Sequence, residues 1–199
     1  MITESKTKEI LKTAKKLYKQ NKFDEALALI SPLISKNQKK AEVWELHAKI
    51  LNDLERFQDA LNSWTNYILI KPKDAWGWQR RGDTYRNLDR FDAAFADYDK
   101  AIELDPTNAW ILGSKSKSYE AMGKYHEALD QINKAIEIEP KNEWSWIYKG
   151  DILLRLEKYK ESLLCYQKAI NLEPKEIWAW IGKSDILTKM QDLHGAWRY

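Results

Sequence analysis

Four of the five prolines recur at a constant spacing. Pro72, Pro106, Pro140 and Pro174 are each 34 residues apart, with no insertion or deletion between them. Because proline stops helices, a proline at a fixed period marks the end of a recurring helical unit. Tryptophan keeps the same period in two series, which are Trp44, Trp78, Trp146 and Trp180, and Trp76, Trp110, Trp144 and Trp178. The chain is therefore one supersecondary unit copied along its length.

The repeats fall at 7–40, 41–74, 75–108, 109–142 and 143–176, and 177–199 forms an incomplete sixth repeat. In each repeat, apolar residues recur at helical spacing over about 14 positions. The pattern is then interrupted, and a second run of apolar residues at helical spacing follows. In the third repeat the break falls at Asp89 and Arg90. This pattern predicts two antiparallel helices per repeat, joined by a short turn.

Polar residues mark the predicted helix starts. Asp74, Asn108 and Asn142 immediately precede a first helix, where a side-chain oxygen can accept from free backbone N–H groups, and Asp92 is placed to do the same for a second helix. Gly82 and Gly150 lie where the two helices of a repeat must approach closely. We number positions from the first residue of each repeat, so both glycines are at position 8.

Charge and cysteine content limit the partners and the cellular compartment that we expect for the chain. Residues 1–40 carry ten lysines against four acids, within a chain of net charge +3, which suggests nucleic acid or an anionic membrane surface as a partner. A solvated outer face on a terminal helix explains the same lysines, so nucleic acid is disfavoured. The single cysteine, Cys165, points to a reducing compartment. With no signal peptide and no apolar run near the roughly 20 residues of a membrane span, we expect a cytoplasmic chain without membrane insertion.

These residues resemble the tetratricopeptide repeat (TPR), whose signature is W-x2-L-G-x2-Y, then A-x3-F, then P. The third repeat reads Trp78-x2-Arg81-Gly82-x2-Tyr85, then Ala94-x3-Tyr98 and Pro106. The resemblance covers residues 7–199 and implies an all-α, right-handed α-solenoid superhelix forming a single domain over 1–199. The leucine of the signature, at position 7, is replaced throughout, and Arg81 is predicted to stack on Trp78.

The sixth repeat departs most from the pattern. It stops near the start of its second helix, and it ends with the apolar residues Leu193, Ala196 and Trp197. A repeat stack needs a polar last layer. Either the chain is a segment of a longer array, or its open end pairs with another molecule.

The two tryptophan series are predicted to have different roles. Position 4 faces neighbouring helices, so Trp44, Trp78, Trp146 and Trp180 are expected in the core. The TPR resemblance places positions 2, 5 and 9 in a concave groove, although the position-2 indoles could instead pack between repeats. The predicted groove residues are Trp76, Trp110, Trp144, Trp178, Gln79, Asp83, Lys117, Ile147, Asp151, Ile181 and Asp185.

No catalytic, cofactor-binding or metal-binding motif is recognisable, so we expect a non-catalytic protein without cofactors. The leading hypothesis is a scaffold that binds a peptide or helix of a partner protein in the tryptophan-lined groove. The C-terminal half of this groove pairs tryptophans and isoleucines with carboxylates, so a ligand with apolar and basic side chains would suit it. A chaperone-tail clamp, with lysine at position 5 and asparagine at position 9, is absent. The alternative is a self-association module that forms homo-oligomers through the sixth repeat.

Overall fold

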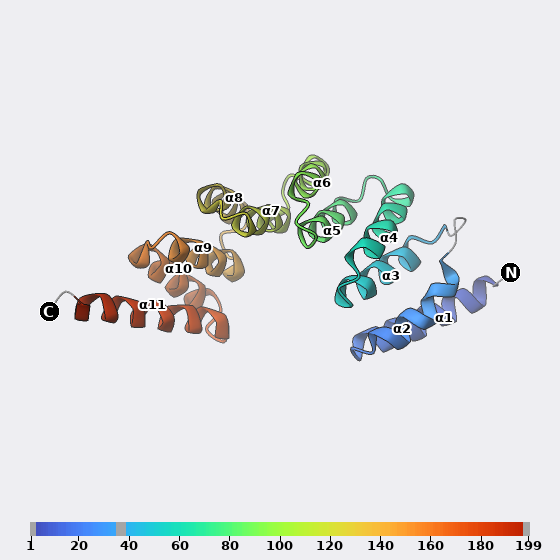
Figure 1. The fold of residues 1–199 in the computed structure, drawn as a ribbon, viewed down its shortest axis with the longest axis horizontal. Helices are drawn as coiled ribbons and strands as arrows, with labels where there is room; N and C mark the ends of the chain where they lie inside the picture. Colours follow the sequence, from blue (N-terminus) through green and yellow to red (C-terminus); the bar gives the residue numbers. More distant parts are fainter. Residues whose placement is uncertain (1–2, 35–38, 197–199) are drawn as a thin grey trace. The chain divides into compact units, whose positions relative to one another are not determined.

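The computed structural model describes residues 3–34 and 39–196, with side chains up to Gln191, and every regular element in this range is a helix (Figure 1). The side chains of Leu193 and Ala196, and all of Trp197, lie outside the described residues. Between residues 3 and 196, no helix combines the length and the apolar character that a membrane crossing requires.

The chain divides into two compact units, Met1–Pro106 and Thr107–Tyr199. The first unit contains α1 (Glu4–Lys19), α2 (Phe23–Ile30), the short 3₁₀ helix η1 (Ser31–Leu33), α3 (Ala41–Asp53), α4 (Phe57–Ile70), α5 (Ala75–Arg86) and α6 (Phe91–Leu104). The second unit contains α7 (Ala109–Ala121), α8 (Tyr125–Ile138), α9 (Glu143–Arg155), α10 (Tyr159–Leu172) and α11 (Ile177–Ala196).

Each complete repeat forms an antiparallel pair of helices, as predicted (Figure 1). In the first unit the pairs are α1–α2, α3–α4 and α5–α6, and α2 packs on α3 as α4 packs on α5. In the second unit the pairs are α7–α8 and α9–α10, while α8 packs on α9 and α10 on α11. The core of each unit is thus a row of contacts between neighbouring helices rather than one central cluster.

The turn inside each repeat is the same left-handed bend. Position 15 has φ between 55° and 72° in all five complete repeats, at Asn21, Glu55, Asp89, Gly123 and Glu157. The backbone N–H that follows closes the turn on a carbonyl five residues earlier, as from Arg90 to Tyr85 at 2.9 Å. This is the Schellman way of ending a helix, and it usually selects glycine. Only Gly123 indicates it in the sequence.

The predicted caps of the first helices are confirmed. Asp74 and Asn108 accept from the backbone N–H of the tryptophan two residues later, at 3.2 Å, and Asn142 accepts from Ser145 at 3.2 Å. The predicted cap at Asp92 is wrong. The residue that precedes α6 is Arg90, whose side chain makes no capping bond, and Asp92 lies within the first turn. There its charge can still favour the positive end of the helix dipole.

Small residues at position 8 let an aromatic ring of the second helix approach, as predicted. A Cβ added to Gly82 would lie 2.7 Å from the ring of Tyr98, and one added to Gly150 would lie 2.9 Å from the ring of Tyr166. Real Cβ atoms do not approach other atoms so closely, so any larger residue at position 8 must displace the ring. The ring is fixed, because Tyr98 and Tyr166 are both almost fully buried.

The position-4 tryptophans correct our expectation of a uniform core. Trp44 is buried at 5% exposure, but Trp78 and Trp146 are half-buried and Trp180 is 49% exposed. The indole N–H of each of these three donates to the carbonyl oxygen of the proline six residues earlier, at 2.9 Å in every case. An indole that must reach this loop carbonyl stays at the edge of the helix pair. The shared 34-residue period of these tryptophans and prolines therefore reflects one hydrogen bond that recurs in each of these repeats.

Position 7 pairs with position 23 across the two helices of a repeat. In the third repeat Arg81 makes a two-pronged ion pair with Asp97, with N···O distances of 2.7 and 2.8 Å, and Asp97 is only 4% exposed. Arg81 also lies over the ring of Trp78 at 4.9 Å, which confirms the predicted stacking. In the second repeat the same positions hold His47 and Ser63, whose Nδ1 and Oγ are 2.8 Å apart.

The sixth repeat contains no turn in the described residues. The bend at position 15 in the other repeats would fall at Gln191, but α11 continues through it to Ala196. We had expected a second helix to begin near this point. Up to Ala196, no second helix covers α11 as the second helix covers the first in each complete repeat.

Candidate functional site

Trp110 and Trp144 border a hollow on the second unit. Its volume is about 600 Å³, and it is lined by Trp110, Glu139, Pro140, Lys141, Asn142, Glu143 and Trp144. Trp110 is 54% exposed, and Trp144 is half-buried. Both indoles extend from the first turn of a first helix, at position 2 of their repeats. The hollow thus lies where the loop between α8 and α9 passes the N-terminal ends of α7 and α9.

Hydrogen bonds fix the backbone around this hollow. Asn108 caps α7 two residues before Trp110, and Asn142 caps α9 directly before Glu143. The Asn142 side chain also donates to Glu139 Oε2 at 3.0 Å, which ties the two ends of the α8–α9 loop together. A site formed before its ligand arrives avoids part of the entropy cost of binding.

The lining of the hollow combines two aromatic faces with a negative balance of charge. Glu139 and Glu143 contribute two carboxylates, against the single ammonium group of Lys141. Indole faces attract cations through the ring quadrupole, and neighbouring carboxylates add a direct charge interaction. This arrangement suits an arginine or lysine side chain better than it suits an acidic one.

Open space adjoins the two indoles. A Cβ added to Gly113, three residues after Trp110, would meet no atom within 4 Å. A smaller gap of about 20 Å³ lies between Trp110, Gly113, Trp144 and Tyr148. The ammonium group of Lys117 lies 4.3 Å from the centre of the Tyr148 ring, so this predicted groove residue is held against an aromatic neighbour.

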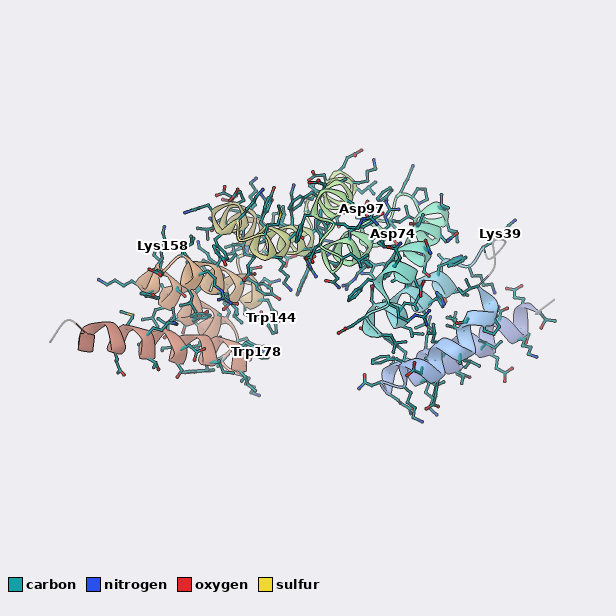
Figure 2. The ribbon with its side chains drawn as sticks, in the orientation of Figure 1. Lys39, Asp74, Asp97, Trp144, Lys158 and Trp178 are labelled. Atoms are coloured by element: carbon teal, nitrogen blue, oxygen red, sulfur yellow. The ribbon has the colours of Figure 1, made fainter. Side chains whose placement is uncertain are left out.

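The remaining predicted residues of the second unit differ in exposure. Trp178 and Ile181 are exposed at 61% and 43%, and Asp185 is exposed as well, whereas Ile147 is only 4% exposed. Trp144 and Trp178 lie near the N-terminal ends of α9 and α11, on the same side of the unit (Figure 2). Ile147 can only support such a surface from beneath.

Asp151 is a partly buried carboxylate at position 9 of the fifth repeat. Burial raises its pKa, and a hydrogen bond of 2.6 Å donated by the Tyr166 hydroxyl opposes that rise. Tyr98 similarly donates to Asp83 at 3.1 Å in the first unit. Asp83 and Asp151, both at position 9, thus each anchor the tyrosine that packs over position 8 of the same repeat.

The predicted residues of the first unit form a more closed surface. The ring of Trp76 packs edge-on against Trp64 and Tyr67, with centroid distances of 5.2 and 5.7 Å, and Lys49 and Arg80 cover its faces. This is the packing between repeats that we had left open as an alternative for position 2.

The other two predicted residues of this unit are also engaged. Gln79 is 7% exposed. Asp83 pairs with Arg86 at 3.2 Å and with Arg80 at 3.6 Å. The structure therefore brings Trp110 and Trp144 together around open space and holds Lys117 against Tyr148, whereas Trp76, Gln79 and Asp83 belong to a packed surface of the first unit.

Reactive side chains are held in unreactive states. Cys165 is 5% exposed, and burial raises the pKa of its thiol to about 11. Burial lowers the pKa of His47 to about 4, so this imidazole is neutral at pH 7. In the parts of the chain that the structure describes, no group of three or more histidine, cysteine or acidic residues could hold a metal ion.

Models of the tetratricopeptide repeat match residues 11–77, 75–108, 97–130 and 144–176, and together they cover most of the sequence. A model of the protein prenyltransferase alpha subunit repeat also matches residues 125–156. A search of curated proteins gave no significant match. With antiparallel helix pairs at a 34-residue period, the fold defines the class of helical repeat proteins. The chain belongs to the tetratricopeptide repeat family.

Solved structures of low sequence identity share the fold. A tetratricopeptide repeat protein from Parabacteroides merdae has a TM-score of 0.82 at 17% identity, over 95% of this chain and 74% of that one. TTC0263, a thermophilic TPR protein in Thermus thermophilus, has a TM-score of 0.74 at 19% identity, over 92% and 99% of the two chains. YrrB, described as a TPR protein with an unusual peptide-binding site, has a TM-score of 0.62 at 18% identity, over 88% and 90%.

Proposed function

We propose that the second unit binds a peptide segment of a partner protein, and that the hollow between Trp110 and Trp144 receives a basic side chain of that segment. The observation that carries this proposal is the hollow itself, with two indoles and two carboxylates around about 600 Å³. Burying an aromatic anchor and its ligand together supplies most of the binding energy in interfaces of this kind. The charges of Glu139 and Glu143 select a cationic ligand over an acidic one.

The chemistry next to the hollow supports a ligand with apolar residues beside the basic one. The exposed Trp178 offers apolar surface on α11, and the second unit has no lysine at position 5 with which to hold a terminal carboxylate. A neighbour in fold, YrrB, is described as having an unusual peptide-binding site, which is consistent with this use of the fold. Protein–protein interaction is thus the proposed role of the whole chain.

The test begins with peptides selected from a displayed random library against the chain, which we expect to be rich in arginine or lysine flanked by apolar residues. Trp110→Ala should weaken binding of a selected peptide about 30-fold, the effect of losing a hot-spot anchor worth about 2 kcal/mol. Isothermal titration calorimetry measures the change. Binding should also weaken with added salt, because part of the attraction is between charges.

Trp180→Ala is the matched control, since Trp180 is 49% exposed in the same unit but does not line the hollow. The control variant should bind the selected peptide like the parent protein. Equal affinity of the parent and Trp110→Ala for every selected peptide would exclude the hollow as the binding site, as would a selection dominated by acidic sequences.

A further inference from the structure

One side of α11 is a continuous stripe of exposed, uncharged side chains. Residues three or four apart on a helix share a face. The stripe consists of Ile177, Trp180, Ile181, Ser184, Leu187, Thr188 and Gln191, and each of these residues is exposed. Charged residues make up 32% of the sequence, yet the stripe contains none. Among the described residues, α11 carries five of the ten large hydrophobic side chains that are exposed. We call this surface the α11 stripe.

The same repeat positions are covered elsewhere in the molecule. In the second repeat, positions 4, 8 and 11 are Trp44, Ala48 and Leu51, with exposures of 5%, 0% and 1%, because α4 packs over them. In α11 the residues at positions 4 and 11 are Trp180 and Leu187, with exposures of 49% and 42%. The α11 stripe therefore has the composition of a helix-packing face. Leaving such a strip in water is unfavourable.

We propose that the α11 stripe is covered by the α11 stripe of a second copy of this chain, in an antiparallel dimer whose two-fold axis passes beside Ser184. A contact across a two-fold axis must be complementary to itself. An antiparallel register centred on Ser184 places Trp180 opposite Thr188 and Ile181 opposite Leu187. Large side chains then meet smaller or matched ones, and the small residue lies where the two helices cross, as Gly82 and Gly150 do within their repeats.

The other end of the chain does not offer a partner for the stripe. Every exposed residue of α1 is polar, and these residues are Glu4, Ser5, Lys6, Lys8, Glu9, Lys12, Thr13, Lys15, Lys16 and Lys19. An apolar stripe placed against this surface would lose the hydration of several charges without burying apolar area on the other side. A head-to-tail array is therefore disfavoured, and the closed dimer is the assembly that the stripe supports.

The dimer surface and the peptide-binding hollow are separate. With 3.6 residues per turn, Asp185 and Trp178 lie about 100° and about 120° around α11 from Ser184, at the centre of the stripe. The hollow is formed by α7, α9 and the α8–α9 loop, and no residue of the stripe lines it. Dimerisation can thus fail while peptide binding remains, and the reverse also holds.

Sedimentation equilibrium over a concentration series is the first test, and we expect the parent chain to form a dimer. Leu187→Glu should weaken dimerisation by about 100-fold or more, because each dimer would contain two carboxylates in an apolar contact. Leu164→Glu is the matched control, since Leu164 is a leucine of α10 that is 70% exposed and lies outside the stripe. Circular dichroism establishes that both variants keep the helical fold. A parent chain that remains monomeric at every concentration, or equal dimerisation of the two variants, would overturn the proposal.

Cross-linking with a short bis-maleimide tests the arrangement of the two copies. Ser184→Cys should give a covalent dimer with high yield, because the two residues face each other across the axis. Thr13→Cys, on the exposed face of α1, should not. Cys165 should stay unmodified in both variants because it is buried. Efficient cross-linking between Ser184→Cys and Thr13→Cys copies in a mixture would show a head-to-tail contact and refute the antiparallel dimer.

Discussion

Arg81→Met is expected to lower the free energy of unfolding of the first unit by about 3–5 kcal/mol. The substitution leaves Asp97, which is 4% exposed, as a buried carboxylate without its counter-ion. The hydrogen bond to Asp97 raises the pKa of Arg81, which shows that the charged form of the pair is favoured in the fold. Urea unfolding followed by circular dichroism measures the loss, and amide hydrogen exchange in α5 and α6 locates it.

The repeat supplies a matched control for this substitution. Lys149 occupies the same position 7 in the fifth repeat, but position 23 there is Cys165, which carries no charge at neutral pH. Lys149→Met therefore removes only an ammonium group that lies over Trp146 at 5.6 Å, a loss of about 0.5–1 kcal/mol. In addition, Asp97→Leu in the Arg81→Met background should recover much of the lost stability, because the double variant has no buried carboxylate without a counter-ion. Equal effects of Arg81→Met and Lys149→Met would mean that the ion pair does not hold the hairpin together.

The second large effect is expected at Tyr166, whose ring joins three helices. The ring contacts Gly150 of α9 and Gly182 of α11 from its place in α10, and the residue is 1% exposed. Tyr166→Ala removes a buried aromatic ring and leaves a cavity between two repeats. The free energy of unfolding of the second unit should therefore fall by about 3–5 kcal/mol. Chemical denaturation followed by circular dichroism measures this change.

Tyr166→Phe separates the ring from its hydroxyl. The phenylalanine keeps the packing over both glycines but removes the 2.6 Å hydrogen bond to Asp151. The partly buried carboxylate would lose its donor, at a cost of about 1–3 kcal/mol. The phenylalanine variant should thus lie between the parent and the alanine variant. If Tyr166→Phe were as unstable as Tyr166→Ala, the hydrogen bond rather than the packed ring would connect the repeats.

Local sequence signals predicted the repeat architecture well. The spacing of Pro72 and its three equivalents defined the repeats, and the side chains of Asp74, Asn108 and Asn142 cap first helices where they were expected. These features depend on a few neighbouring residues, so they can be read without knowing the tertiary structure. The turns were less visible, because Asn21, Glu55, Asp89 and Glu157 adopt the left-handed conformation that the sequence signals only at Gly123.

Features that depend on packing between repeats were harder to predict. Trp76 is covered because Tyr67, at position 27 of the preceding repeat, fills the space beside it, whereas the equivalent residues before Trp144 and Trp178 are Ala135 and Ala169. The exception at Tyr67 was visible in the sequence, and it could have distinguished the packed indole from the exposed ones. Hydrogen bonds from position-4 indoles to the proline carbonyls have no signature beyond the shared period.

The hollow itself was only partly predictable. Trp110 and Trp144 were expected in the groove, but Glu139, Lys141 and Glu143 were not. These charged residues occupy the loop between repeats and the start of α9, where charged side chains are ordinarily only solvated. Their contribution depends on how the Asn142 cap turns the loop toward the two indoles, and that is a property of the folded chain.

The central claim is that a partner peptide binds between Trp110 and Trp144, and the indole region of a ¹H–¹⁵N correlation spectrum tests it most directly. Adding a peptide selected against the chain should shift the indole signals of Trp110 and Trp144 together, in proportion to occupancy. The signal of Trp64, which is 0% exposed in the first unit, should stay in place. Saturable binding of the peptide with both hollow signals unmoved would contradict the account.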